Sequence, residues 1–263
     1  MLLVETRLRK QPSQARSRST VEAFLEAADR ILRKEGYDAA STNRLAKVAG
    51  FSVGSLYQYF DDKQAVVGTL VDRELRQEAR DLVRVLDSSP PRDLRSALHT
   101  IIDYVVGRRC EAAHLHRTLA DHADELAGQE PLAYAMHVQS PLSAEAMQRV
   151  LGPFLIQTGS VEPRLSILFW WIQAVSHCFA VESPAHLGPA RMVLALTDAA
   201  VRFVESTATP SADATELVTE WQRAASIGGA HQESRARRLQ EVRTLVLRVC
   251  GNYGEGLEAS VQV

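Results

Sequence analysis

Apolar residues recur along this chain at intervals of three and four, the spacing that places side chains on one face of an α-helix. Ser19 and Glu22 have the spacing of a capping box, and Gly36 can end a helix because glycine accepts positive φ. Between them lie six apolar residues at helical spacing: Val21, Phe24, Leu25, Ala28, Ile31 and Leu32. We therefore predict a helix that begins at Ser19 and ends before Gly36.

A pair of shorter helical patterns follows and meets at Gly50. Ser41 is a suitable N-cap for the first, in which Leu45 and Val48 lie on one apolar face. Ser52 can cap the second, which we expect to extend over about eight residues. Two short helices joined by a tight turn are predicted.

The second short helix exposes more polar and aromatic groups than packing requires. Its outward positions are Val53, Gly54, Ser55, Tyr57, Gln58 and Tyr59. Tyrosine and glutamine side chains suit the major groove, which admits one helix and offers donors, acceptors and thymine methyl groups. Gly54 would let the backbone approach a phosphate closely. We interpret the pair as a helix-turn-helix that binds DNA.

Lys63 follows this motif directly. Asp61 and Gln64 have the spacing of a helix start, so Lys63 is expected in a first turn, where free backbone N–H groups favour an anion. A phosphate contact fits this position. The alternative is a solvated surface lysine.

Residues 20–63 resemble the DNA-binding domain of the tetracycline-repressor (TetR/AcrR) family. The resemblance lies in Thr42, in Leu45-Ala46, in the run Ala49-Gly50-Phe51-Ser52-Val53-Gly54-Ser55-Leu56-Tyr57-Gln58-Tyr59-Phe60, and in Lys63. It implies an all-α homodimer with an N-terminal three-helix DNA-binding domain, followed by a helical domain that binds an effector and dimerises.

The resemblance also implies roles for single residues. Thr42 and Ser52 would contact backbone phosphates, and Tyr59 and Lys63 would grip phosphate. Bases or their flanking phosphates would be contacted by Val53, Ser55, Tyr57 and Gln58. Val53 stands where many relatives carry lysine or another polar residue, so a charged contact is lost there and a thymine-methyl contact becomes available.

Composition restricts these interpretations. The chain has 263 residues, 46% hydrophobic and 24% charged, which is ordinary for a globular protein. A net charge of -2 confines any basic DNA footprint to part of the surface. Cys110, Cys178 and Cys250 lack metal-like spacing and fit a reducing cytoplasm. We expect a cytoplasmic protein with neither signal peptide nor membrane span.

Residues 1–18 form a separate basic segment. The segment contains one acid, Glu5, and five basic residues: Arg7, Arg9, Lys10, Arg16 and Arg18. We expect a flexible arm that either adds contacts to phosphates or the minor groove, or remains a solvated tail. The DNA-binding domain then covers residues 19–63.

Residues 64–207 are expected to form the effector-binding and dimerisation domain. It begins with a long helical pattern that ends at Ser88-Ser89-Pro90-Pro91. Within residues 163–206, two helical segments are apolar on several faces, which suits either a homodimer interface or a buried monomer core. Residues 208–263 are expected to be a weakly structured extension, whose basic stretch is either solvated or a further DNA or partner contact.

Catalytic and metal chemistry have little support. His114, Thr118 and His122 share one predicted helix face, with His116 and Asp121 nearby, but no metal-ligand spacing or nucleophile motif accompanies them. We expect no enzyme, no metal and no cofactor. An enzyme built on His114, His116 and Asp121 is the alternative.

The favoured hypothesis is a sequence-specific transcriptional regulator, a ligand-released repressor that acts as a homodimer on a palindromic operator. An unknown small-molecule effector would bind between the helices of residues 92–180. Pocket candidates are Tyr104, Tyr134, Met136, Trp170 and His177, although such residues are more often plain core than ligand contacts. The alternatives are a DNA-binding activator and an architectural helical binder without small-molecule control.

Overall fold

The computed structural model describes residues 8–9, 15–127, 150–155, 162–182 and 187–205. Within these ranges every regular element is helical, which confirms the all-α prediction. The elements are α1 (Ala15–Glu35), α2 (Thr42–Ala49), α3 (Val53–Tyr57), α4 (Lys63–Ser88), α5 (Leu94–Glu111), α6 (Ala113–Ala127), the 3₁₀ turn η1 (Gly152–Phe154), α9 (Glu162–Glu182) and α10 (Pro189–Glu205).

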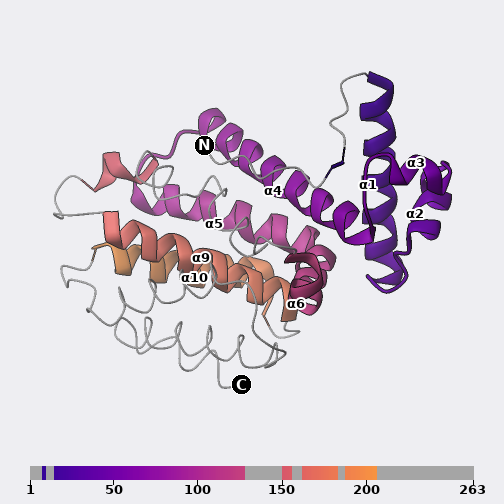
Figure 1. Ribbon diagram of the computed structural model, residues 1–263. Coiled ribbons are helices and arrows are strands. Elements are labelled where there is room, and N and C mark those ends of the chain that lie inside the picture. The colour runs from indigo at the N-terminus through magenta and orange to yellow at the C-terminus, as the bar shows by residue number, and fades with distance from the viewer. Residues whose placement is uncertain (1–7, 10–14, 128–149, 156–161, 183–186, 206–263) are drawn as a thin grey trace.

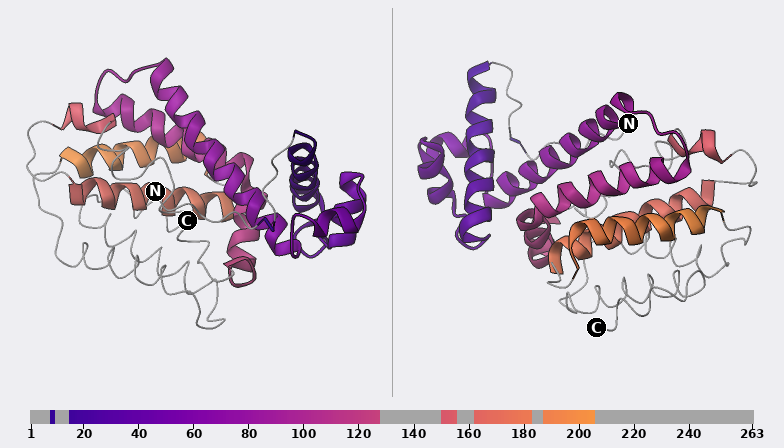
Figure 2. Two further views of the ribbon diagram at one scale, coloured as in Figure 1. Left: turned by 45° about the horizontal axis from the view of Figure 1, so that its top comes forward. Right: turned by 180° about the vertical axis from the view of Figure 1, so that it is seen from behind.

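The helices form two groups that α4 connects. Helices α1, α2 and α3 lie together at one end of the molecule, and α5, α9 and α10 lie side by side in the other part (Figures 1 and 2). The short helix α6 lies at the junction and contacts α1, α4 and α9. The N-terminal helices therefore contact the larger helical part through both α4 and α6.

The core of the N-terminal group consists of the apolar faces predicted from sequence. Phe24, Leu45, Leu56 and Phe60 are fully buried, and the Phe24 and Phe60 rings meet edge to face with centroids 6.2 Å apart. The same core continues beyond residue 63, into α4 and α6. Its members there are Ala65, Val66, Val67, Leu70, Val71, Leu115, Leu119 and Leu126.

A second core lies among α5, α9 and α10. Helix α9 has apolar residues on several faces, and its buried residues include Ile167, Leu168, Phe169, Trp171 and Ile172. The predicted burial of this helix on more than one side is therefore observed. Within the described residues, no helix combines the length and apolarity needed to span a membrane.

Helix α1 begins at Ala15, one turn before the predicted start at Ser19. Residues 15–18 were expected to belong to a flexible arm. They are helical instead, which corrects the prediction. The segment contains no helix breaker, and the Thr20 hydroxyl donates to the Arg16 carbonyl one turn back at 3.0 Å. Ser19 thus lies inside the helix and does not cap it.

Helix α3 is shorter than predicted. It ends at Tyr57 after five residues, and Gln58 is its C-cap. The following helix is capped by Asp62, whose carboxylate accepts from the Ala65 N–H at 2.7 Å, and not by Asp61. Both differences arise where the chain must turn sharply to bury Phe60.

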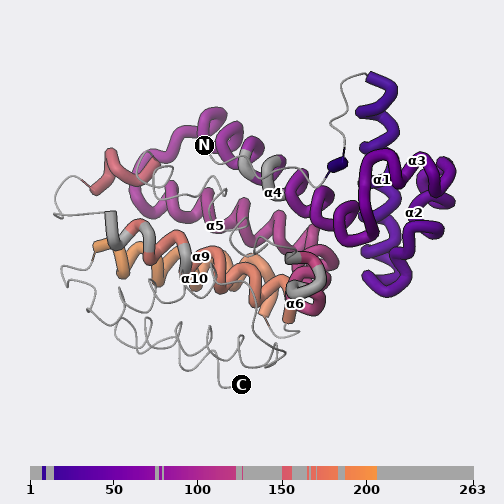
Figure 3. Tube along the Cα trace, viewed as in Figure 1, coloured from indigo at the N-terminus to yellow at the C-terminus, as the bar shows by residue number. Residues whose placement is uncertain are grey.

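Helix α4 is continuous over 26 residues (Figure 3). At 1.5 Å per residue its length is about 39 Å. Its first half belongs to the N-terminal core, whereas Leu82 and Leu86 pack with the second core. One rigid element therefore spans both groups.

Candidate nucleic-acid interface

The turn between α2 and α3 has the geometry that its sequence predicts. The Ser41 hydroxyl caps α2 by accepting from the Arg44 N–H at 3.2 Å. Gly50 has φ of 77°, and the Phe51 N–H donates to the Ala46 carbonyl at 3.0 Å. These bonds satisfy the groups left free at the helix end, so the chain reverses without a buried unpaired backbone group.

Ser52 caps α3 as predicted. Its hydroxyl accepts from the Ser55 N–H at 3.1 Å and lies 2.9 Å from the Ser55 hydroxyl. Leu56, fully buried behind these serines, fixes α3 against the N-terminal core. The cap and this anchor hold the helix with its opposite face outward.

The predicted contact residues differ in exposure. Ser52, Gly54, Tyr57 and Gln58 are exposed, and Tyr57 keeps 43% of its surface. The remaining predicted residues of this region are half-buried: Thr42, Val53, Ser55, Tyr59 and Lys63. The expectation that Val53, Ser55 and Tyr59 turn mostly outward is thus only partly met, because Val53 and Tyr59 also pack against the N-terminal core.

The structure brings Thr42 and Tyr57 together across the turn. The Thr42 hydroxyl, at the start of α2, lies 3.4 Å from the Tyr57 hydroxyl at the end of α3. Two hydroxyls from different helices therefore face solvent side by side. They can donate to phosphate oxygens or accept from base edges.

Lys63 is the first residue of α4 and lies over an aromatic ring that sequence reasoning did not single out. Its Nζ is 3.9 Å from the ring centroid of Tyr37, and the His122 ring of α6 stacks on Tyr37 with centroids 4.1 Å apart. Two groups this close to one centroid cannot share a face, so they cover opposite faces of the ring. Lys63 is thereby linked through Tyr37 to α6.

α6 itself departs from helical geometry at His122, with φ of -125° and ψ of 27°. Leu119 and Leu126 on either side of this kink are buried in the N-terminal core. Farther back on α6, the His116 Nδ1 lies 3.1 Å from the Nδ1 of His177 on α9. One short helix therefore contacts both groups of the fold.

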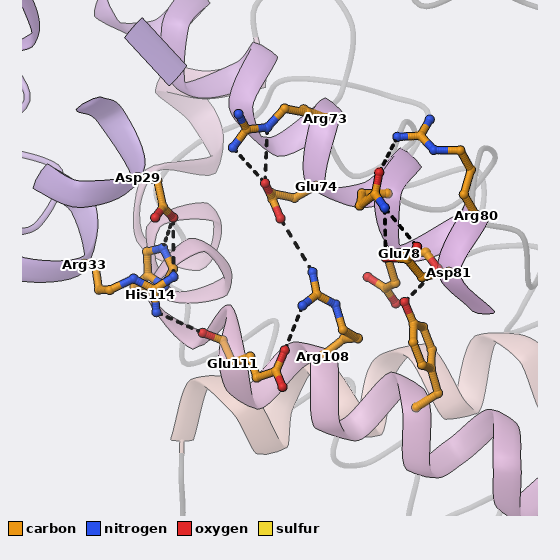
Figure 4. A network of polar contacts seen from close by, with 12 residues as sticks. Asp29, Arg33, Arg73, Glu74, Glu78, Arg80, Asp81, Arg108, Glu111 and His114 are labelled. Atoms are coloured by element: carbon orange, nitrogen blue, oxygen red, sulfur yellow. Dashed lines mark hydrogen bonds and ion pairs between the residues drawn. The ribbon is translucent and has the colours of Figure 1, made fainter. Parts of the chain in front are cut away.

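A set of charged residues crosses the junction (Figure 4). On α1, the Asp29 carboxylate lies 2.7 Å from the His114 Nε2 of α6 and accepts from it when that nitrogen carries the proton. Arg33 lies 3.5 Å from Asp29 and donates to the Glu111 carbonyl at 3.3 Å. Burial lowers the pKa of His114, and its hydrogen bond to Asp29 opposes that effect. These contacts fix α1 against the end of α5 and the start of α6.

Further ion pairs join α4 to its neighbours. Glu74 lies 2.9 Å from Arg73 and 3.6 Å from Arg108, which also pairs with Glu111 at 2.7 Å (Figure 4). Arg73 additionally pairs with Glu22 of α1. All of these side chains are at least partly exposed, so each pair contributes little stability alone, and their role is to fix relative position.

The second group contains several buried or half-buried polar groups. Arg109 is only 4% exposed, and its Nη1 donates to the Gln173 carbonyl at 3.3 Å. Burial raises the pKa of Glu78, and the nearby Arg109 opposes that shift. Burial also lowers the pKa of His177 to about 4 and holds the pKa of His116 well below its usual value, so both are neutral near pH 7.

The predicted effector residues are only partly described. Tyr104 donates its hydroxyl to the Glu78 carbonyl at 3.0 Å, and His177 contacts His116. Tyr134 and Met136, and the side chain of Trp170, lie outside the described residues. Neither Tyr104 nor His177 lines either of two cavities that described residues form.

These cavities lie on α4. One, of about 380 Å³, is lined by Val83, Leu86, Asp87, Pro91, Val150, Pro153 and Phe154. The other, of about 20 Å³, is lined by Val71, Glu74, Glu78, Arg108, Ala112, Leu115, His116 and Leu119. Sequence reasoning missed these residues because charged groups on amphipathic helices ordinarily indicate solvent exposure.

Three histidines proposed as part of an enzyme or metal site have structural partners. His114 contacts Asp29, His116 contacts His177 and His122 stacks on Tyr37. In the described part of the chain, no three potential metal ligands are grouped together. Their arrangement is accounted for by packing between helices.

Comparisons with known proteins agree with this geometry. Residues 24–70 match the family described as bacterial regulatory proteins, tetR family. An uncharacterized HTH-type transcriptional regulator of Mycobacterium tuberculosis strain H37Rv, Rv1255c, is 29% identical over 143 residues, which is 54% of this chain and 67% of that protein. The nicotine-responsive repressor HdnoR of Paenarthrobacter nicotinovorans is 28% identical over 82 residues, 31% of this chain and 41% of that protein.

The fold also has a counterpart among solved structures. A putative TetR-family transcriptional regulator from Mesorhizobium loti superposes with a TM-score of 0.60 at 22% identity, covering 73% of this chain and 98% of that one. At this level of identity the likeness concerns the fold.

The three-helix unit with its capped, solvent-facing α3 defines a DNA-binding transcriptional regulator of the helix-turn-helix class. Residues 24–70 match the DNA-binding domain of the TetR family of these regulators, as the resemblance at residues 20–63 indicated.

Proposed function

We propose that the protein is a ligand-released repressor that acts as a homodimer on a palindromic operator. The observation that carries the proposal is the exposed surface of α3, formed by Ser52, Gly54, Tyr57 and Gln58 in front of the buried Leu56. A helix anchored on one face that presents hydroxyl, amide and aromatic groups on the other suits the major groove.

Contact roles follow from exposure and position. Thr42 and Ser52 are assigned to backbone phosphates, because each lies at a helix start, where free backbone N–H groups favour an anion. Tyr57 and Gln58 are assigned to base edges, with Val53 and Ser55 beside them. Tyr59 and Lys63 are assigned to phosphates, which set the register of the helix on the duplex.

The homodimer is assigned to α9 and α10. Both helices carry more apolar residues than one buried face needs, and Leu194 on α10 is exposed. A two-fold axis through these helices would set two copies of α3 about 34 Å apart, the spacing of successive major grooves. A single copy of α3 offers too few base contacts for a specific operator.

We assign the site of the releasing ligand to the second group of helices, which contains α5, α9 and α10. The cluster of Glu78, Arg109, His116 and His177 places costly polar groups between helices, an arrangement more typical of binding sites than of plain cores. The similarity to HdnoR, a nicotine-responsive repressor, supports the proposal that this protein represses transcription and that a small molecule controls it. An effector that prefers one arrangement of α6 would change DNA affinity by about 5- to 150-fold.

The test begins with the full-length protein and a random duplex library. Selection should enrich a palindrome whose half-sites lie about one helical turn apart, and footprinting should show protection of both halves. A Tyr57→Ala, Gln58→Ala variant should select no such site, whereas Arg92→Ala, which removes an exposed charge just before α5 and away from α3, α9 and α10, should select the same one. Enrichment of a lone half-site would contradict the dimer.

The second stage measures release. A panel of small lipophilic compounds is added to the selected complex, and a release-competent compound should weaken binding of the wild-type protein. Transcription from a promoter that carries the operator should be low without the compound and rise with it. The opposite response would assign the protein as an activator, and no response across a broad panel would favour an architectural role.

A further inference from the structure

Arg9, in the basic N-terminal segment, makes three contacts at the end of the recognition helix α3. Its backbone N–H donates to the Tyr59 carbonyl at 2.9 Å. Its Nη1 donates to the Tyr57 carbonyl at 3.4 Å, and its Nε lies 3.0 Å from the Asp61 carboxylate. Next to it, Leu8 packs against the N-terminal core.

These contacts fall where α3 is least supported by itself. A five-residue helix leaves most of its carbonyls without an intrahelical partner, and its C-terminal end favours a positive charge. Arg9 supplies both a donor and a cation at that end. It also bonds the backbone that follows α3, which carries Tyr59 and leads to Lys63.

The distribution of charge along the sequence gives a second reason why the position of Arg9 matters for DNA binding. Residues 19–63 contain six Lys or Arg and seven Asp or Glu, so the DNA-reading unit alone has a net charge of -1, and α3 itself carries no charged side chain. Residues 1–18 contain five basic residues and one acid, a net charge of +4. Positive charge for a DNA footprint therefore comes largely from the N-terminal segment.

We propose that Arg9 is a positioning residue for DNA binding. It fastens the basic N-terminal segment to the C-terminal end of α3 and neutralises Asp61, whose exposed carboxylate would otherwise repel the phosphates that approach Lys63. The inference rests on the proposed DNA-binding role of α3. It assigns to Arg9 an effect exerted through Asp61 and through the backbone after α3.

The solvent exposure of Arg9 and Asp61 limits how much their ion pair can change DNA affinity. The Arg9 and Asp61 side chains are 55% and 66% exposed, so their pairing is a surface ion pair. Such pairs contribute at most about 1 kcal/mol, which corresponds to about a fivefold change in affinity. Removal of Arg9 should therefore weaken binding by about two- to fivefold and not abolish it.

The test compares matched variants on a duplex selected by the wild-type protein. Arg9→Ala and Arg16→Ala each remove one positive charge from the same region, but no ion pair of Arg16 with a described acidic residue is observed. Arg9→Ala should weaken binding by about two- to fivefold more than Arg16→Ala. In an Asp61→Asn background this extra loss should largely disappear, because the carboxylate that Arg9 neutralises is absent.

Two results would overturn the proposal. Equal losses in Arg9→Ala and Arg16→Ala would show a general charge effect. The extra loss of DNA affinity in Arg9→Ala could also persist undiminished in the Asp61→Asn background, together with a slope of log affinity against log salt that is lower by about one. That result would show that Arg9 binds a phosphate directly.

A measurement without DNA separates this inference from the proposed function. Amide hydrogen exchange in the free protein should be faster at Tyr57, Tyr59 and Phe60 in Arg9→Ala than in wild type, and unchanged in Arg16→Ala. Unchanged exchange in Arg9→Ala would contradict the fastening role even if DNA binding is observed. If no duplex is selected but exchange changes as expected, the proposed function fails and the fastening role stands.

Discussion

The ammonium group of Lys63 lies 3.9 Å from the ring centroid of Tyr37, which His122 covers from the opposite face. A residue assigned to phosphate thus rests on a ring that α6 also holds. The lysine stem is ordered before DNA arrives, so less side-chain entropy is lost when its charge meets a phosphate.

Replacement of Tyr37 tests this arrangement. Tyr37→Leu removes the ring and should lower the free energy of unfolding by about 1–3 kcal/mol. It should also weaken DNA binding by about two- to fivefold, because the cation–π contact that orders Lys63 is lost. Tyr37→Phe keeps the ring and is the control. Urea unfolding and fluorescence titration with the selected duplex measure the two effects, and equal DNA affinity for both variants would argue against the role of the ring.

Lys63 and Tyr57 should differ in what they contribute to DNA binding. Lys63→Ala should weaken binding to all sequences alike and reduce the slope of log affinity against log salt by about one, because one phosphate contact is lost. Tyr57→Ala should change the ranking of operator variants and leave that slope nearly unchanged. Titrations over a range of salt concentrations with a panel of single-base variants decide between these outcomes, and a common effect of both substitutions would contradict the assignments.

Two glycines four residues apart should respond in opposite ways to alanine. Gly50 has φ of 77°, so Gly50→Ala should destabilise the fold by about 1–2 kcal/mol. Gly54 lies within α3, where a Cβ would meet only the Ser52 hydroxyl at an ordinary 3.7 Å. Gly54→Ala should therefore stabilise the fold by up to about 1 kcal/mol yet weaken DNA binding, because its methyl group occupies the exposed face. Thermal unfolding together with duplex titration tests both parts.

The buried histidines predict a loss of stability in acid. The pKa of His177 in the folded protein is lowered to about 4, and the pKa of His116 is lowered in the same direction, so the unfolded chain binds protons that the folded chain does not. Stability should be complete above about pH 6.5 and fall toward pH 4, by about 1.4 kcal/mol per pH unit from His177, with a further loss in the same direction from His116. His177→Gln should flatten the fall, and His99→Gln at an exposed position of α5 is the control. Denaturant unfolding at several pH values measures it, and a slope that His177→Gln leaves unchanged would contradict the attribution.

The local features of the DNA-reading unit could be predicted because each depends on a few neighbouring residues. Ser41 and Ser52 cap helices through bonds to N–H groups three positions ahead, and Gly50 takes positive φ within the turn itself. The end of α3 at Tyr57 depends on more distant residues, including Arg9, 48 positions away. Periodicity along the chain contains no information about such a partner.

The polar junction could not be predicted for the same reason. His114 meets Asp29 across 85 residues, and His116 meets His177 across 61. In the sequence these histidines appear only as neighbours on one predicted helix, which gave little support to a metal or catalytic site but did not identify their partners. Only the arrangement of α1, α6 and α9 shows those partners.

The length of the continuous helix α4 determines how far a tilt would move its first residue. Because the helix is about 39 Å long, a tilt of about 10° about its far end would carry its first residue, Lys63, through about 7 Å. Neighbouring phosphates on one DNA strand are spaced by about 3.4 Å along the axis, so this displacement spans about two base pairs. If Lys63 contacts a phosphate as proposed, a tilt of α4 of this size would take the lysine out of register with it.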